Sequence, residues 1–321
     1  MLDAFLHAVI AVFVLGCVAG LGYYSASLGW YDEKGKKLVS KIVGLTIPFF
    51  LFSTITSRFT HEELVNLLQY TGLPFLAFAC FLAISILLCK TGFVREEWQG
   101  TFIAQFSGSS LLFVGIPVTL AMIGDSGIPY LLLYFIPNVF FIWTVGLYCI
   151  QLDGVRKNGG ARPKLFSAQS VKMVFTKPLI GFMLGVAVVL IGLAVPKPIA
   201  MACKMIGQIS SPLALVFIGI TIYQIGFKKF AKLPREIWLV LAACNFIKPV
   251  VMYLITLPFD MDALARQVLV MAACMPVSPM TGVLAKLHDG PAEFASACAG
   301  VSVVALTFTL PLIMMAVSFI G

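Results

Sequence analysis

The sequence predicts an all-α integral membrane protein whose ten transmembrane helices form two inverted repeats of five. Three observations predict it: an excess of apolar residues, a series of charge-free stretches, and proline-marked segments that recur along the chain. Of the 321 residues, 60% are hydrophobic and 11% are charged, and the mean hydropathy is +1.01. Soluble domains carry about a quarter charged residues, so this composition excludes a soluble single-domain enzyme.

Ten charge-free stretches divide the chain. A helix rises about 1.5 Å per residue and the bilayer core is about 30 Å thick, so roughly 20 apolar residues make one crossing. In chain order the stretches are 4–31, 42–57, 64–89, 98–124, 126–152, 178–196, 205–227, 237–259 (interrupted by Lys248 alone), 267–285 and 294–321. The shortest, 42–57, is long enough when Lys41 and Arg58 extend their charged ends to the interface.

Basic residues indicate how these spans are oriented. With ten spans, 17 of the 22 Lys and Arg residues fall in connections on one side of the bilayer and four on the other. Basic residues are enriched in cytoplasmic connections, so we expect a multi-pass protein of the cell (plasma or inner) membrane with both termini on the non-cytoplasmic side. The net charge of +8 is spread over five connections, which does not favour binding to nucleic acid.

Cysteine and histidine residues do not indicate a metal or redox centre. The eight cysteines lie in or beside apolar stretches without a C-x-x-C pair, and the three histidines lie near span ends. We interpret the cysteines as small apolar fillers. No span has Asp, Glu or His at its centre, so we expect neither an intramembrane enzyme nor a cofactor.

A polar connection divides the chain into two sets of five spans. Residues 1–152 are predicted to form the first repeat, residues 153–172 a cytoplasmic loop, and residues 173–321 the second repeat. An odd number of spans in each half inserts the second copy upside down. This is the plan of many secondary transporters, in which substrate binds near the midplane at interrupted helices.

Prolines mark matching positions in the two halves. Pro48 and Pro212 lie 164 residues apart, and Pro117 and Pro279 lie 162 residues apart. In the ninth span, Pro276 and Pro279 lie three residues apart, so two backbone donors are missing and a continuous helix is not expected. These spacings favour two related halves with an interruption in the ninth span.

The fourth span is also predicted to be interrupted, because Ser109 and Ser110 lie shortly before Pro117. Irregular backbone at this depth is tolerated only where it is buried in protein or lines a wet cavity. A half-helix N-terminus in such a cavity presents unpaired N–H groups and positive potential, which suit an anion. The alternative for both spans is an ordinary proline kink, with Ser and Gly serving close helix packing.

Lys248 is the one ionisable side chain predicted near mid-bilayer, and Asn245 lies on the same helical face. A cation there costs at least ~2.5–3.5 kcal/mol, so a partner is expected. All fourteen Asp and Glu residues lie outside the charge-free stretches, so the partner is either backbone carbonyl groups or the substrate's own negative charge. A structural clamp and a role in substrate binding or gating both remain open.

Four segments of the chain form a recognisable series. They are Lys37-Leu38-Val39-Ser40-Lys41 with Pro48 and Leu51-Phe52-Ser53, Gly115-Ile116-Pro117 followed by Met122-Ile123-Gly124-Asp125, Ser211-Pro212-Leu213-Ala214-Leu215, and the stretch from Pro276 to Ala285-Lys286. In these segments and their order the chain resembles the auxin efflux carrier family, which includes the plant PIN carriers and bacterial malate permease and malonate carrier type proteins. The resemblance implies a five-plus-five inverted repeat whose broken fourth and ninth spans cross at prolines, at Pro117 and at Pro279 or Pro276. It also implies transport of organic anions by alternating access.

The chain departs from the family pattern at the crossover. Members often carry Asn there, whereas the matching positions here are Ser110 and either Met280 or Thr281. A hydroxyl is a shorter and weaker partner for a carboxylate than an amide donor. The identity of the substrate therefore does not transfer from the family.

Our leading hypothesis is a secondary carrier for a small organic anion, such as a mono- or dicarboxylate, in the lipid bilayer, with proton or sodium coupling and a homodimeric state left open. The alternatives are a sodium-coupled organic anion symporter of the bile-acid symporter type and, from another class, a channel or a receptor. The residues expected at the substrate site are Ser109, Ser110, Pro117, Asn245, Lys248, Pro276, Ser278, Pro279 and Thr281.

Overall fold

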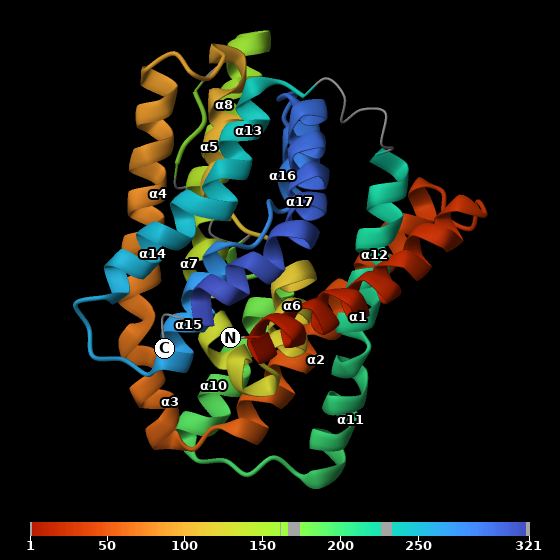
Figure 1. The fold of residues 1–321 in the computed structure, drawn as a ribbon, viewed down its shortest axis with the longest axis vertical. Helices are drawn as coiled ribbons and strands as arrows, with labels where there is room; N and C mark the ends of the chain where they lie inside the picture. Colours follow the sequence, from red (N-terminus) through yellow and green to blue (C-terminus); the bar gives the residue numbers. More distant parts are fainter. Residues whose placement is uncertain (1, 161, 166–173, 226–232, 319–321) are drawn as a thin grey trace.

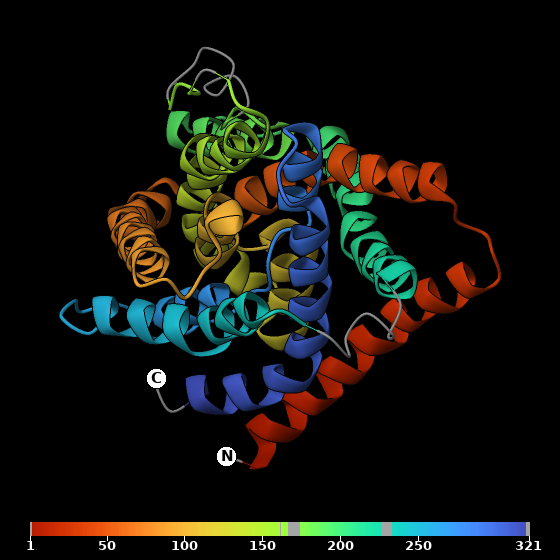
Figure 2. The same cartoon turned by 90° about the horizontal axis from the view of Figure 1, so that it is seen from above.

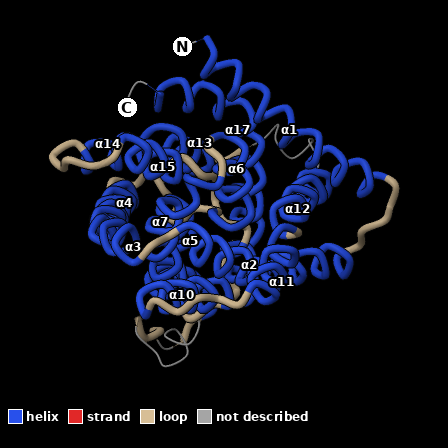
Figure 3. The backbone as a smooth tube through the Cα atoms, turned by 90° about the horizontal axis from the view of Figure 1, so that it is seen from below, coloured by secondary structure: helices blue, strands red, loops and turns tan. Residues whose placement is uncertain are grey.

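The structure is a computed structural model, and it describes residues 2–160, 162–165, 174–225 and 233–318. All regular structure in these residues is helical, and Figure 3 contains no strand. This confirms the all-α prediction. The prediction of a cytoplasmic loop at 153–172 falls partly outside the described residues, because 161 and 166–173 are not among them.

Six helical segments are long and apolar enough to cross a membrane. They are Glu33–Arg58, His61–Lys90, Glu96–Met122, Asp125–Asn158, Lys197–Gln224 and Arg235–Thr256. Four shorter apolar helical stretches also lie in the described residues, at Phe13–Ser27, Lys177–Ile191, Ala263–Ala273 and Ala292–Leu306. Several membrane-spanning helices are therefore present, while ten crossings in an inverted repeat stay a prediction.

Figure 1 shows the order of the helices along the chain. Those of the first half are α1 (Leu2–Ser27), α2 (Glu33–Arg58), α3 (His61–Leu68), α4 (Gly72–Lys90), α5 (Gln99–Ser107), α6 (Ile116–Met122), α7 (Ile128–Phe141) and α8 (Leu147–Asn158). Those of the second half are α10 (Lys177–Ile191), α11 (Lys197–Gln208), α12 (Ser210–Ile225), α13 (Arg235–Ala242), α14 (Lys248–Thr256), α15 (Ala263–Ala273), α16 (Met280–Leu287) and α17 (Ala292–Ser318).

Side chains near the helix ends explain where several helices begin. The Asp32 carboxylate caps α2 by accepting a hydrogen bond from Gly35 N at 2.7 Å, and Thr60 and Glu63 form a reciprocal capping box on α3. Both oxygens of the buried Asp153 carboxylate accept from backbone N–H groups at the start of α5, at 2.8 and 2.6 Å. Because Asp153 lies on α8, these two bonds hold the start of α5 against α8.

Glycines bring the backbones of one group of helices close together. This group consists of α1, α2, α10, α11 and α12; α1 packs along α12, and α2 packs against α10, α11 and α12 (Figure 2). A Cβ atom on Gly219 would overlap the Ala19 carbonyl group, and one on Gly22 would overlap the Val216 carbonyl group. Only glycine fits at such contacts, which are typical of helix packing in membranes.

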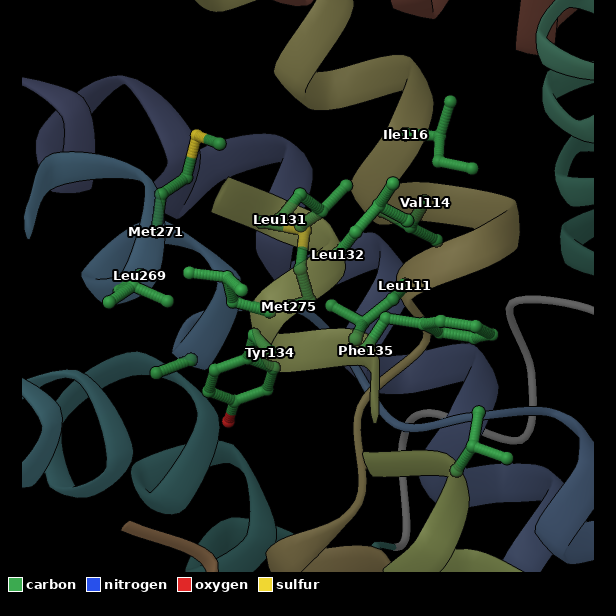
Figure 4. Packing of buried hydrophobic residues seen from close by; sticks show 14 of the residues in the cluster. Leu111, Val114, Ile116, Leu131, Leu132, Tyr134, Phe135, Leu269, Met271 and Met275 are labelled. Carbon is green, nitrogen blue, oxygen red and sulfur yellow. The ribbon is translucent and has the colours of Figure 1, made fainter. Parts of the chain in front are cut away.

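The remaining helices surround the most buried segments of the chain. Over the most apolar part of each segment, 78% of the residues of Glu96–Met122 and 72% of those of Asp125–Asn158 are buried, whereas the share is 39–44% in the other four long segments. The apolar core gathers around them, and Figure 4 shows Leu111, Leu132 and Met275, from three different segments, close to one another. These two segments therefore lie inside the protein rather than on its periphery.

Both helices that the sequence predicts to be interrupted are interrupted. One segment runs as α5, an irregular stretch at 108–110, the π-helical turn η3 (Leu111–Gly115) and then α6. The other runs as α15 and α16 with irregular backbone at 275–278. Pro117 lies at the start of α6, directly after the π-helical turn η3, so the irregular backbone at 108–110 precedes this proline along the chain.

Candidate functional site

The two interruptions meet. The backbone N–H of Ser110 donates a hydrogen bond of 2.7 Å to the carbonyl oxygen of Pro276. This contact joins residues 166 positions apart in the sequence, and it places Ser109, Ser110 and Pro276 of the predicted site together. The ends of four half-helices, α5, η3 with α6, α15 and α16, therefore gather at one point, which we call the crossing.

Asn138 on α7 holds the first interrupted segment of the crossing. Its Oδ1 accepts from Ser109 N at 2.9 Å, and its Nδ2 donates to Ser109 O at 3.0 Å. Both bonds are buried, so they replace helical partners that the interruption removes. Asn138 is not among the site residues predicted from the sequence. The feature that could have indicated it is an amide side chain in an otherwise apolar stretch, directly after Pro137.

Ser302 on α17 performs the corresponding role for the second interrupted segment. Its Oγ accepts from Val277 N at 3.1 Å and donates to Ala299 O at 2.9 Å. In each half, a polar side chain from the helix that follows the interruption thus satisfies a backbone N–H within it. Ser302 was also missed, because a lone hydroxyl in a membrane helix usually serves packing or bonds its own backbone.

Lys248 contacts the crossing from α14. Its side chain is fully buried, and Nζ donates to Ser109 Oγ at 3.0 Å and to Gly108 O at 3.3 Å. Gly108 is the C-cap residue of α5, where the carbonyl groups carry the negative end of the helix dipole. The contacts are those of a clamp on backbone and hydroxyl oxygens.

Asn245 lies one turn before Lys248 and is directed elsewhere. Its Nδ2 donates to Leu241 O at 2.8 Å, and its Oδ1 accepts from Thr309 Oγ1 at 2.6 Å. It therefore joins its own helical segment to α17. The structure places Asn245 away from the contacts that form the crossing.

The start of α16 carries three of the predicted residues. Thr281 Oγ1 donates to Ser278 O at 2.7 Å, and Ser278 Oγ accepts from Met280 N at 3.4 Å. Gln105 on α5 reaches this helix, because its Nε2 donates to Thr281 Oγ1 at 3.2 Å and to Ala295 O at 2.8 Å. Gln105 Oε1 is buried and has no hydrogen-bond partner in the described residues.

A small pocket lies where the crossing faces α12. It has a volume of about 20 Å³, and its lining includes Ser110, Phe113, Phe217, Thr221 and Pro279. Ser110 is 3% exposed, and its Oγ finds no hydrogen-bond partner among the described residues. None of the residues that line the pocket is charged. It offers a buried hydroxyl and an aromatic wall beside the half-helix ends, and neither Lys248 nor Pro117 lines it.

Known proteins match almost the whole chain. The sequence model of the family described as "Membrane transport protein" matches residues 5–314. An uncharacterised transporter of Methanocaldococcus jannaschii is 24% identical over 279 residues, which cover 84% of this chain and 85% of the archaeal protein. A Rhizobium meliloti protein named "Putative malonate transporter" is 26% identical over 287 residues, or 86% of this chain and 85% of that protein. The match to the family model includes both interrupted helices.

Proposed function

Because the chain belongs to the Membrane transport protein family, the auxin efflux carrier family, we propose that it is a secondary carrier that moves small organic anions by alternating access. The observation that carries the proposal is the crossing, where two interrupted helices meet beside a pocket with a buried hydroxyl, Ser110 Oγ, that has no hydrogen-bond partner in the described part of the chain. Irregular backbone at mid-membrane is the usual place for substrate in secondary transporters.

An anion is the charge that suits this site. The first N–H groups of η3 have no partners within their own helix, and helix N-termini carry positive partial charge. At the start of α16, Thr281 N and Gly282 N donate to the carbonyl oxygens of Ser278 and Pro279. Met280 N is weakly capped by Ser278 Oγ at 3.4 Å, which an incoming carboxylate oxygen can replace. In the proposal, one carboxylate of the substrate lies between these two N-termini and accepts from Ser110 Oγ.

The proposed ten-span inverted repeat fits the pairing of the helices. In such a repeat α1 corresponds to α10, and α2 corresponds to α11 with α12. The close contact of α1 with α12 then has a counterpart in the contact of α10 with α2. The hydrogen bond from Ser109 N to Asn138 in the first half likewise has a counterpart in the bond from Val277 N to Ser302 in the second half.

Alternating access requires two groups of helices that can be displaced relative to each other. One group is α1, α2, α10, α11 and α12, and the other contains the crossing with α4, α7, α8, α13, α14 and α17. The pocket lies between them, because Phe217 and Thr221 belong to α12 whereas Ser110 and Pro279 belong to the crossing. Displacement of α12 would open it to one side or the other.

Counterflow in proteoliposomes tests the function. Liposomes that contain the purified protein and excess unlabelled malonate are diluted into labelled malonate, and we expect transient, saturable accumulation of label. Malonate is the first probe because one relative carries it in its name. Ser110→Ala should weaken uptake, whereas Ser126→Ala, at an exposed position, should not.

Further arms of the same experiment separate the remaining functions. Imposed proton and sodium gradients identify the coupling ion, and strict dependence on sodium would favour a sodium symporter. Single-channel currents in planar bilayers would indicate that the protein is a channel and not a carrier. Absence of counterflow for every member of a panel of mono- and dicarboxylates would refute the proposal.

A further inference from the structure

We propose that Lys36, on α2, supplies the positive charge of the pocket and makes the carrier prefer dianions to monoanions. The inference rests on the proposed function and adds to it a substrate class and a residue that selects that class. It starts from a mismatch within the site. The pocket beside the crossing suits an anion, yet none of the described residues that line it is charged.

Lys248 does not supply this charge. Its ammonium group is bonded to Gly108 O and Ser109 Oγ, and it approaches the interruption from α14. The pocket lies on the α12 side, where Ser110, the next residue along the chain, contributes to the lining. Consecutive residues in non-helical backbone point in different directions, so Ser109 meets the lysine and Ser110 meets the pocket.

Lys36 approaches the pocket from the opposite group of helices. Its Nζ lies 5.8 Å from the centre of the Phe217 ring, and that ring contacts Phe113 with 5.0 Å between ring centres. Phe113 and Phe217 both line the pocket together with Ser110. The ammonium group of Lys36 therefore lies over one of the rings that line the pocket together with Ser110, whose hydroxyl has no hydrogen-bond partner among the described residues.

The position of Lys36 on α2 distinguishes it from the neighbouring lysines. Lys34 and Lys37 are exposed, whereas Lys36 is half-buried and shares a helix face with the buried Val39, which packs in the same apolar cluster as Phe217. The ammonium group of Lys36 forms no hydrogen bond or salt bridge with a described residue, its nearby carboxylate Glu33 acts on it only electrostatically, and a cation near an aromatic face is held only weakly. Its charge is therefore available to a ligand.

A second carboxylate needs such a cation. One carboxylate can be satisfied by the neutral donors at the crossing, but a second negative charge in a water-poor site requires a charged partner. With one carboxylate at Ser110 and the other at Lys36, a short dicarboxylate would bridge the two groups of helices. The present pocket, at about 20 Å³, has room for roughly one water molecule, so this binding requires Phe217 to move away from Phe113.

The test compares malonate with its monomethyl ester, which keeps the carbon skeleton but carries one charge. In proteoliposomes we expect Lys36→Gln to raise the KM for malonate about tenfold or more, as for loss of a hydrogen bond to a charged group, and to leave the KM for the ester unchanged. Lys36→Arg should retain most of the preference. Lys37→Gln, which removes the same charge at an exposed position, is the matched control and should behave like the wild type.

Binding in detergent supplies a second readout that does not depend on turnover. Malonate should raise the unfolding temperature of the wild type more than the ester does, and Lys36→Gln should remove this difference while leaving the protein monodisperse. An equal effect of Lys36→Gln on both compounds, or no effect on either, would overturn the role of Lys36. Wild-type protein that transports neither compound, nor any other carboxylate, would instead refute the proposed function.

Discussion

The ammonium group of Lys248 lies 3.0 Å from Ser109 Oγ and 3.3 Å from the carbonyl oxygen of Gly108, and no described carboxylate pairs with it. The last carbonyl groups of a helix lack partners within it, and a cation near them is favourable. The hydrogen bonds of Lys248 at the C-terminal end of α5 thus offset part of the free-energy cost of burying its charge. Of the two roles that the sequence left open, these contacts favour the clamp.

The clamp predicts how substitution of Lys248 acts. Lys248→Ala leaves a cavity and an unsatisfied carbonyl group, so we expect about 2–5 kcal/mol of destabilisation. The apparent unfolding temperature and the maximal transport rate should fall, with little change in KM. Lys248→Met, which fills most of the volume, should recover part of the stability. Lys37→Ala, at an exposed position, is the control. A normal unfolding temperature combined with a strongly raised KM would indicate that the ammonium group binds substrate.

Asn138 predicts a second destabilising substitution. Asn138→Leu has a similar volume but removes both bonds to Ser109, which leaves a buried N–H and a buried C=O unpaired. Each such group costs about 1–3 kcal/mol, so the unfolding temperature should fall by several degrees or more. Asn66→Leu, at an exposed position of α3, should have little effect. Comparable stability of the two variants would mean that Asn138 does not support the crossing.

Ser302 predicts a smaller effect of the same kind. Ser302→Ala removes one acceptor from Val277 N and leaves a single buried N–H unpaired, at a cost of about 1–3 kcal/mol. Its effect on thermal unfolding should be smaller than that of Asn138→Leu, and Ser302→Thr should retain the bond. An effect larger than that of Asn138→Leu would show that the two interruptions are not supported in comparable ways.

The sequence predicted the position of one interruption better than that of the other. Pro276 and Pro279 lie three residues apart, and the missing donors leave no continuous helix between α15 and α16. For the other segment, the resemblance implies a crossing at Pro117, whereas the irregular backbone lies earlier, at 108–110. Pro117 lies within α6, and the interruption lies where Asn138 bonds both backbone groups of Ser109.

The partners of the crossing could not be predicted from local sequence. Asn138 and Ser302 lie 29 and 25 residues from the backbone groups they satisfy, and Lys248 lies 139 residues from Ser109. Periodicity and charge-free length determine which segments are apolar helices, but they do not determine which helix faces meet. The sequence also does not show that Lys36 is half-buried, because the nearby Lys34 and Lys37 are of the same residue type and only the packing of α2 distinguishes them.

The glycine contacts between α1 and α12 predict a position-specific loss of stability. Gly219→Ala places a methyl group against the Ala19 carbonyl and should force the helices apart, at a cost of about 1–3 kcal/mol or more. Gly20→Ala on α1 is the control, because nothing lies within 4 Å of the position that its methyl group would take, and alanine favours the helix by up to about 1 kcal/mol. Thermal unfolding should separate the two variants, and equal stability would contradict the close approach.

The ion pair between Arg58 and Asp125 predicts an effect on transport rate rather than on stability. It joins the end of α2 to the turn after α6, and both side chains are about half exposed, so it contributes at most about 1 kcal/mol. If the two groups of helices are displaced during transport, the pair must break. Arg58→Gln and Asp125→Asn should then change the maximal malonate rate by similar factors of up to about fivefold, with little effect on unfolding temperature.

The double substitution distinguishes this role of the pair from two separate roles. Removing both partners should change the rate no more than removing one, because the shared interaction is already lost. The exchanged pair, Arg58→Asp with Asp125→Arg, should restore part of the wild-type rate, and Glu62→Gln on the neighbouring α3 should leave it unchanged. Additive effects of the two single substitutions, or no recovery in the exchanged pair, would mean that Arg58 and Asp125 act independently in transport.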